Sequence, residues 1–92
     1  MPDDAASKYT LYFTPPAQKD YDAVRDLKLR RGIERILDEI KEDPYQFKKL
    51  SGSLAHLRSA KTFSFRILYQ IKNQKLIIIV VAIGSRKDVY RQ

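Results

Sequence analysis

Two arginines and a tyrosine in the second half of the chain are the side chains most suited to chemistry. Arg66 stands among Phe, Ile and Leu in "FSFRILYQI", Arg86 follows the apolar run "LIIIVVAI", and Tyr90 comes four residues later. An arginine in the middle of an apolar strand is costly to bury unless it pairs with an acid or faces solvent or a ligand. Because residues 48–92 contain a single acid, Asp88, a ligand-facing Arg66 is favoured over an ion pair with an acid on a helix.

These side chains suit the cleavage of RNA without a metal ion. In that reaction the 2′-hydroxyl attacks the adjacent phosphorus, negative charge grows on the phosphoryl oxygens, and the departing 5′ oxygen takes up a proton. Arginines stabilise the growing charge, and a tyrosine acts as general base if neighbouring cations lower its pKa from about 10. Four further cations in this half of the chain would hold the RNA backbone, and these are Lys48, Lys49, Arg58 and Lys61.

Other kinds of chemistry have little support in the sequence. The chain has one histidine, His56, and no cysteine, and its acids lack the spacing of metal ligands. We therefore expect no metal site, no cofactor, no Ser-His-Asp arrangement and no glycine-rich phosphate loop. His56 itself is expected to be structural or simply exposed.

Charge is unevenly divided along the chain. Residues 1–47 hold eight cations and ten acids, whereas residues 48–92 hold ten cations and one acid, within an overall net charge of +7. A basic half with almost no acid is typical of a protein that binds a polyanion. Nucleic acid and an acidic protein partner both fit this pattern, whereas a surface that only keeps a protein soluble more often mixes the signs.

The elements that must position these residues follow from the hydrophobic pattern. β-favouring residues predict a strand at 8–13, and the Thr-Pro-Pro sequence after it predicts a short helix at about 16–26. A second helix is predicted from apolar residues at helical spacing and ends at Asp43-Pro44. Its apolar stripe consists of Leu29, Ile33, Ile36, Leu37 and Ile40.

The second half of the chain changes to strand patterns. Residues 44–54 are predicted to be a loop, and strands are predicted after it at 55–61, 63–71 and 76–83. The last strand, "LIIIVVAI", shows no alternation, which predicts burial on both faces and a central place in the sheet. We expect a single α+β domain over residues 1–92 in the order β-α-α-β-β-β. A two-helix hairpin would pack on one face of a mostly antiparallel four-stranded sheet.

Two consequences concern location and partners. Residues 1–7 are expected to be a disordered lead-in without a signal-peptide pattern, and the longest apolar run is too short to span a bilayer. We therefore expect a cytoplasmic protein that does not contact a membrane. Two helices cover only one face of the sheet, which leaves an apolar patch near Arg66 and Leu68 for a partner, unless the 44–54 loop folds over it.

The order of several short segments resembles the RelE/ParE superfamily of bacterial and archaeal toxins from toxin–antitoxin systems. The matching pieces are "KKLSG", "FRILYQI", the apolar last strand, the "IGSR" ending and the terminal "VY", which lie between residues 48 and 90. The resemblance as a whole covers roughly residues 8–90. The resemblance implies a small toxin that a cognate antitoxin wraps and neutralises. In the RelE branch, which we favour, it implies a metal-independent endoribonuclease that cleaves mRNA in the ribosomal A site and inhibits translation.

Residue by residue, the resemblance implies roles for three side chains. Arg66 in "FRILYQ" and Arg86 in "GSR" match arginines thought to stabilise the transition-state phosphate, and Tyr90 matches a tyrosine implicated in proton transfer or stacking. The chain departs from the branch on the preceding strand, where a K-x-K or R-x-R pattern is common and "RSAK" stands instead. Two alternatives remain open: a ParE-type inhibitor of DNA gyrase that cleaves nothing, and a basic RNA-binding module without catalysis.

Overall fold

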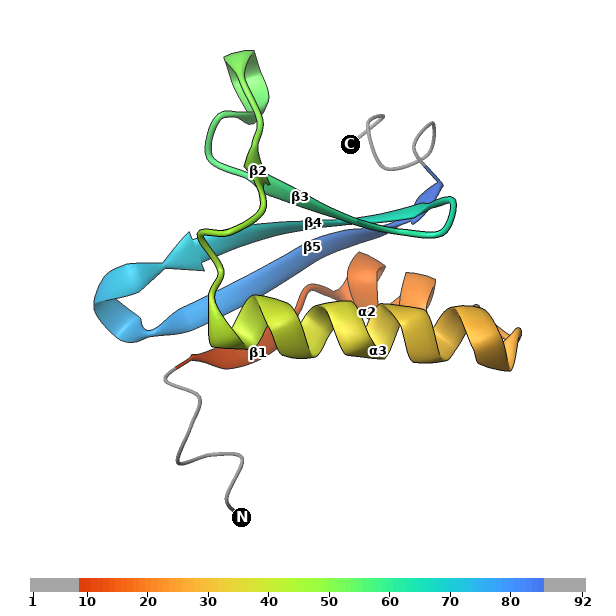
Figure 1. Ribbon diagram of the computed structural model, residues 1–92. Coiled ribbons are helices and arrows are strands. Elements are labelled where there is room, and N and C mark those ends of the chain that lie inside the picture. Colours follow the sequence, from red (N-terminus) through yellow and green to blue (C-terminus); the bar gives the residue numbers. More distant parts are fainter. Residues whose placement is uncertain (1–8, 86–92) are drawn as a thin grey trace.

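The computed structural model describes residues 9–85, which form a layer of two helices against one sheet (Figure 1). The elements are β1 (Thr10–Phe13), α2 (Pro15–Asp22), α3 (Leu27–Glu42), β2 (Lys48–Lys49), the 3-10 turn η1 (Gly52–Leu54), β3 (Arg58–Thr62), β4 (Phe65–Lys72), the 3-10 turn η2 (Asn73–Lys75) and β5 (Ile77–Ser85). The predicted lead-in 1–7 and the candidate residues Arg86 and Tyr90 lie outside the described residues.

The sheet has five strands in the order β1-β5-β4-β3-β2. β1 runs parallel to β5, and the other neighbouring strands are antiparallel. The predicted α+β class, with a helix pair on one face, is confirmed. The prediction of four strands is wrong by one, because Lys48 and Lys49 of the expected loop pair with Ser59 and Arg58 as a short edge strand.

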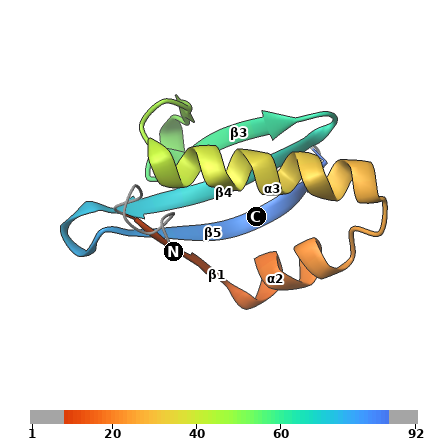
Figure 2. The same cartoon turned by 60° about the horizontal axis from the view of Figure 1, so that its bottom comes forward.

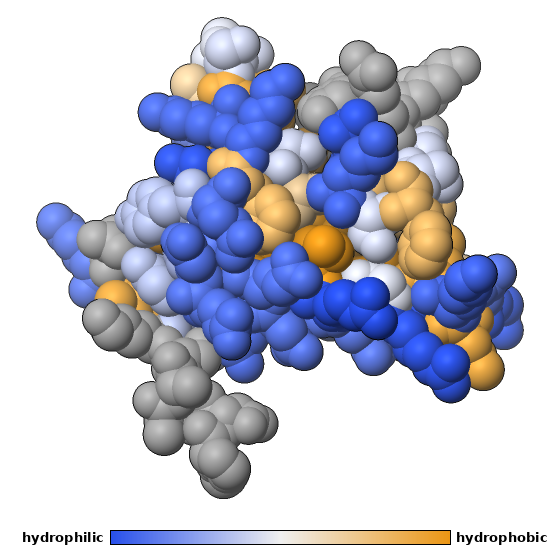
Figure 3. All heavy atoms as spheres, viewed as in Figure 1, coloured by the Kyte–Doolittle hydropathy of each residue, from blue (hydrophilic) through white to orange (hydrophobic). Residues whose placement is uncertain are grey.

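The two helices begin at side-chain caps and cover one face of the sheet. Thr14 accepts a hydrogen bond from the N–H of Ala17 (3.3 Å) and Asp26 accepts one from the N–H of Leu29 (3.0 Å), which pairs amides that the first turn leaves free. α2 packs on β5 and α3 packs on β3 (Figure 2). The inner face of α3 buries Ile33, Leu37 and Ile40, whereas its outward side is covered with hydrophilic side chains (Figure 3).

The main core lies between the helices and the sheet. Strand side chains alternate between the two faces, and those directed toward the helices are Ala60, Ile67, Tyr69, Ile78, Val80 and Ile83. The alternation predicted for β4 is confirmed from Phe65 onward. Phe63, predicted to begin this strand, lies instead in the β3–β4 turn with a φ of 51° and an exposed side chain.

β5 is less buried than its apolar sequence suggests. Leu68 pairs with Ala82 and Tyr69 pairs with Val80, so Val81 is an extra residue that shifts the β4–β5 register. From the start of β5 up to and including the bulge residue, the half-buried residues are Ile77, Ile79 and Val81. The prediction of a strand buried on both faces is therefore wrong for its first half, although its place between β1 and β4 is inside the sheet.

The face of the sheet opposite the helices, here called the open face, is covered only in part. Leu50 and Leu54, from the segment between β2 and β3, pack with Leu57, Leu68 and Ala82. The prediction of an exposed apolar patch near Arg66 and Leu68 is therefore wrong, because this segment buries Leu68 completely. Half-buried apolar side chains lie elsewhere on the open face, at Ile77 and Ile79. No helix within residues 9–85 has the length and apolar character needed to cross a membrane.

Candidate functional site

Arg66 and Lys61 lie side by side on the open face. Lys61 is directly opposite Arg66 in the β3–β4 ladder, and Gly84 of β5 is opposite Arg66 on its other side. Residues opposite one another in a ladder point to the same face, and Leu68, two residues beyond Arg66, belongs to the open-face cluster. The register therefore places two predicted cations together, and Gly84 presents no side chain to them.

The side chain of Arg66 is half-buried, and its surroundings within residues 9–85 contain no partner for its charge. Among these residues, no carboxylate forms an ion pair with Arg66 and no group forms a hydrogen bond with its guanidinium. Partial burial weakens the hydration of a charge, and the described part of the chain supplies no partner in return. That Arg66 faces a ligand stays a prediction.

Lys48 lies on the same face, one strand further out. It pairs with Ser59 of β3, which in turn pairs with Leu68 of the open-face cluster. Lys48 is exposed, while Ser59 is only 7% exposed and its hydroxyl finds no hydrogen-bond partner in the described part of the chain. Three of the predicted site cations, Lys48, Lys61 and Arg66, therefore lie on the open face. Beside them lies the buried Ser59 hydroxyl, which was not among the predicted site residues.

The signal for Ser59 was present in the sequence. Ser59 and Lys61 are two residues apart, so their side chains point to the same face of a strand. The sequence "RSAK" stands where the resembling branch commonly has two basic residues. In the structure, only Lys61 of this pair brings charge to the open face.

The other two predicted cations, Lys49 and Arg58, have a different environment. Arg58 pairs with Tyr69 of the main core, so it points to the helix side of the sheet. Its Nη1 donates to the carbonyl oxygens of Phe47 (2.8 Å) and Tyr45 (3.3 Å), and its guanidinium carbon lies 5.1 Å from the centre of the Tyr45 ring. Lys49 is opposite Arg58. The four cations predicted to hold one RNA backbone are therefore divided between two faces.

Two tyrosines of the main core, Tyr69 and Tyr9, have raised pKa values. Burial raises the pKa of Tyr69, whose hydroxyl donates to the Pro44 carbonyl oxygen (2.6 Å). Burial also raises the pKa of Tyr9, with a contribution from the neighbouring Tyr45 and Asp43. A raised pKa keeps both phenols protonated, so neither suits the role of general base. A part in proton transfer or base stacking was predicted for Tyr90, which lies outside the described range.

His56 is exposed, as expected. Within residues 9–85, no three His, Cys, Asp or Glu side chains form a cluster that could hold a metal ion. The chemistry available at the open face is thus that of guanidinium, ammonium and hydroxyl groups, which bind phosphate by charge and hydrogen bonds.

Known proteins show clear similarity to this chain. The family model described as the ParE toxin of the type II toxin–antitoxin system, parDE, matches residues 11–90. Toxin RelG of Mycobacterium tuberculosis is 27% identical over 85 residues, which cover 91% of this chain and 98% of that toxin.

Solved structures share the fold. The toxin–antitoxin complex RelBE2 of M. tuberculosis contains a chain with 25% identity and a TM-score of 0.75, covering 86% of this chain and 99% of that one. The isolated RelE toxin of E. coli has 26% identity and a TM-score of 0.75, covering 90% and 92% of the two chains.

Proposed function

Because the chain belongs to the ParE toxin family of type II toxin–antitoxin systems, within the RelE/ParE superfamily, we propose that this toxin cleaves mRNA on the ribosome. The observation that carries the proposal is Arg66, half-buried beside Lys61 without an acidic partner in the described range. A guanidinium that meets no carboxylate in the described range can receive the negative charge that grows on a phosphate during transfer.

In the proposed reaction, the open face holds the RNA and the C-terminal segment completes the site. The scissile phosphate lies against the Arg66 guanidinium, which offers two parallel N–H donors to the phosphoryl oxygens. Arg86, two residues after Gly84 in the sequence, is proposed as a second arginine at the same phosphate. Tyr90 transfers a proton or stacks a base, and Lys48 and Lys61 bind the neighbouring phosphates.

A cognate antitoxin is the proposed protein partner, in line with the RelBE complexes among the structural relatives. Its binding surface is proposed on the uncovered part of the open face. There Tyr12 is 54% exposed and lies opposite Ile79, next to a shallow hollow of about 500 Å³. The hollow is lined by Ile71, Lys72, Gln74, Lys75, Ile77 and Ile79. Apolar side chains with lysines at the margin suit an amphipathic segment that carries acids.

Inhibition of DNA gyrase is the second candidate function. It is favoured by the family description, which is that of ParE toxins, and by Ser59, which stands on the open face of β3 where a second basic residue would suit a nuclease. In this case the toxin would cleave nothing, and the basic face would contact the gyrase–DNA complex.

Mapping of mRNA 5′ ends after induced expression distinguishes the two candidates. We expect new 5′ ends within translated regions, and their loss in an Arg86→Ala variant that remains folded. Intact mRNA together with cleaved DNA–gyrase complexes would contradict the nuclease and support the second candidate. An Arg86→Ala variant with full cleavage would remove Arg86 from the proposed site but leave the activity standing.

A further inference from the structure

Residues 43–49, which are the segment that joins α3 to β2 together with β2 itself, form hydrogen bonds to the rest of the molecule through side chains. The Gln46 side-chain amide donates to the carbonyl oxygens of Glu39 and Asp43, both at 3.1 Å. The Tyr69 hydroxyl holds the carbonyl of Pro44, and Arg58 holds those of Tyr45 and Phe47. These bonds fix the positions from which Tyr45 and Lys49 extend, so that the two side chains begin from an ordered backbone.

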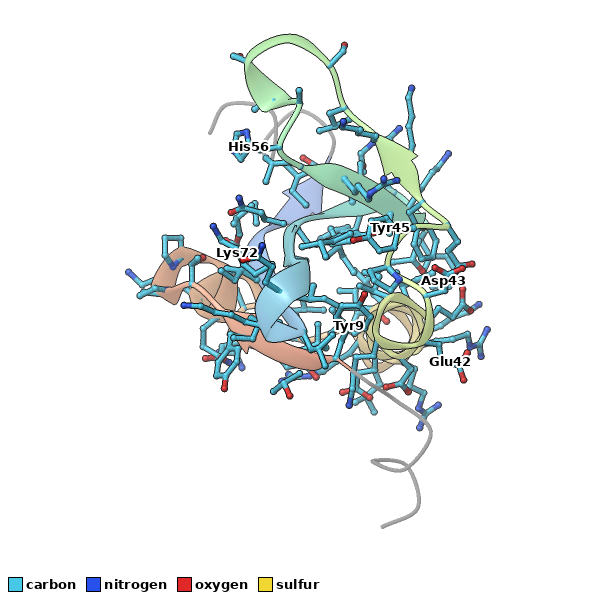
Figure 4. The ribbon with its side chains drawn as sticks, turned by 90° about the vertical axis from the view of Figure 1, so that its left-hand side faces the viewer. Tyr9, Glu42, Asp43, Tyr45, His56 and Lys72 are labelled. Carbon is cyan, nitrogen blue, oxygen red and sulfur yellow. The ribbon has the colours of Figure 1, made fainter. Side chains whose placement is uncertain are left out.

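A hollow of about 190 Å³ opens beside this segment. Its lining combines two permanent cations, Lys49 and Arg58, with the His56 imidazole and the Tyr45 ring, and no carboxylate among the described residues lines it. His56 and Tyr45 are both labelled in Figure 4. Ala55, Leu57 and Ile71 complete the wall.

We propose that this hollow binds a phosphate group of RNA, at a site separate from the open face. Only Nη1 of Arg58 is used by the Tyr45 and Phe47 carbonyls, so Nη2 and Nε keep their donors for an anion. Lys49, opposite Arg58 in the ladder, adds an ammonium group, and His56 adds an imidazole N–H. A ring beside fixed cations suits RNA better than an acidic peptide, because an unpaired base stacks on Tyr45 while its phosphate meets Arg58 and Lys49.

The two phosphate sites are too far apart to hold the same phosphate. Arg58 is opposite Tyr69, which is three residues beyond Arg66 on β4, a displacement of about 10 Å along the strand. They also lie on different faces of the sheet, as the core position of Tyr69 and the open-face position of Leu68 show. The inference rests on the proposed function in that RNA is the ligand, but it does not require that the RNA be cleaved.

Salt-dependent binding of an RNA that resists cleavage tests this site. A fluorescent 2′-O-methyl RNA of about 12 nucleotides is titrated with the toxin by anisotropy across a range of salt concentrations. Each phosphate contact on a single strand contributes about 0.7 to the slope of log affinity against log salt. We expect the double variant Lys49→Gln/His56→Gln to lose about 0.7 of slope and to bind several-fold more weakly. Lys28→Gln, an exposed lysine of α3, is the matched control and should bind as the wild type does.

The remaining outcomes separate the second site from the proposed function. If the double variant binds RNA as the wild type does while Arg66→Ala binds it more weakly, the hollow is not a phosphate site. The proposed binding of RNA by the open face is then supported. If the wild-type protein does not bind this RNA, the second site is also wrong, and the 5′-end mapping decides the nuclease independently. If a glutamate-rich peptide of equal charge displaces the RNA from the wild type but not from the double variant, the hollow is a site for acidic protein, and the RNA assignment is overturned.

Discussion

Arg58 and Arg66 lie on neighbouring strands and are both half-buried, yet their surroundings differ in every other respect. Arg58 points to the helix side, where two backbone carbonyls and an aromatic ring receive its charge. Arg66 points to the open face, where no group in the described part of the chain accepts a hydrogen bond from it and no carboxylate pairs with it. Burial alone therefore does not distinguish the two arginines, whereas the hydrogen bonds that each makes within the described residues do.

The difference has an energetic side. Taking a guanidinium partly out of water costs free energy, which hydrogen bonds to fixed acceptors offset at Arg58. At Arg66 the same cost has no compensation inside the described protein, and Lys61 opposite adds repulsion. A bound phosphate would supply both acceptors and opposite charge. The four predictions that follow test this contrast, from the largest expected effect to the smallest.

Replacement of Arg66 should have the largest effect, and on activity rather than stability. For Arg66→Ala we expect the rate of mRNA cleavage on purified ribosomes to fall by about 10²–10³, the usual cost of removing a group that stabilises transition-state charge. The free energy of unfolding in urea should not fall by more than about 0.5 kcal/mol, since no bond within the described protein is lost.

The conservative variant sharpens this prediction. Arg66→Lys keeps the charge but not the paired N–H donors, and should cleave at a rate between those of the wild type and Arg66→Ala. Full activity in either variant, in a protein that unfolds as the wild type does, would contradict the assignment of Arg66 to the phosphate.

The placement of Arg66 was predictable from the sequence because "FSFRILYQI" alternates cleanly. Phe65, Ile67 and Tyr69 mark the core face, and residue 66 must then point the other way. The burial of β5 was not predictable, since a bulge at Val81 leaves no trace in a run of apolar residues. Without alternation, the sequence could not indicate which half of that strand is half-exposed.

The separation of the basic residues was equally hidden from the sequence. The acceptors of Arg58 are backbone carbonyls of Tyr45 and Phe47, more than ten positions away, and any residue type can present a carbonyl. β2 has only two residues, too few for a pattern, so nothing indicated that Lys48 and Lys49 alternate between faces. Hydrogen bonds between side chains and backbone atoms are therefore the part of this site that could not be predicted from the sequence.

Replacement of Arg58 should affect stability instead. Arg58→Ala removes two hydrogen bonds from a charged donor and leaves the Phe47 carbonyl without its partner, which should lower the free energy of unfolding by about 2 kcal/mol. Urea denaturation measures this loss. Lys61→Ala, an exposed position on the same strand, is the matched control and should cause no loss of stability. A loss at Arg58 no larger than at Lys61 would show that the contacts to the 43–49 segment are weak.

The Tyr69 hydroxyl, which like Arg58 donates to a backbone carbonyl of the segment before β2, should contribute less to the free energy of unfolding than Arg58 does. Tyr69→Phe removes one buried hydrogen bond to the Pro44 carbonyl and should cost about 1 kcal/mol at neutral pH. Because burial raises the pKa of Tyr69, the unfolded chain loses this proton first, near pH 10. The contribution is therefore complete below about pH 10 and declines as the pH rises beyond it, by at most about 1.4 kcal/mol per pH unit.

Unfolding measured from pH 8 to pH 11.5 tests the pH dependence. The wild type should lose stability above about pH 10 more steeply than Tyr69→Phe does. Tyr12→Phe, which changes a tyrosine that is 54% exposed, is the matched control for the loss of a phenol hydroxyl. Parallel curves for the wild type and Tyr69→Phe would mean that the phenol ionises equally in the folded and unfolded chains.

Lys61→Gln should have the smallest effect, but one whose sign distinguishes a binding residue from a structural one. Lys61 and Arg66 are like charges directly opposite each other, so neutralising one of them should raise the free energy of unfolding by about 0.2–1 kcal/mol. The same change removes a phosphate contact and should lower the salt slope of RNA binding by about 0.7. A residue kept for folding could not give this combination of greater stability and weaker binding. Lys75→Gln is the matched control and should change neither quantity, because Lys75 lies in η2, beyond the end of the β4–β5 ladder. A loss of stability in Lys61→Gln would show that Lys61 makes stabilising contacts on the open face that outweigh its repulsion with Arg66.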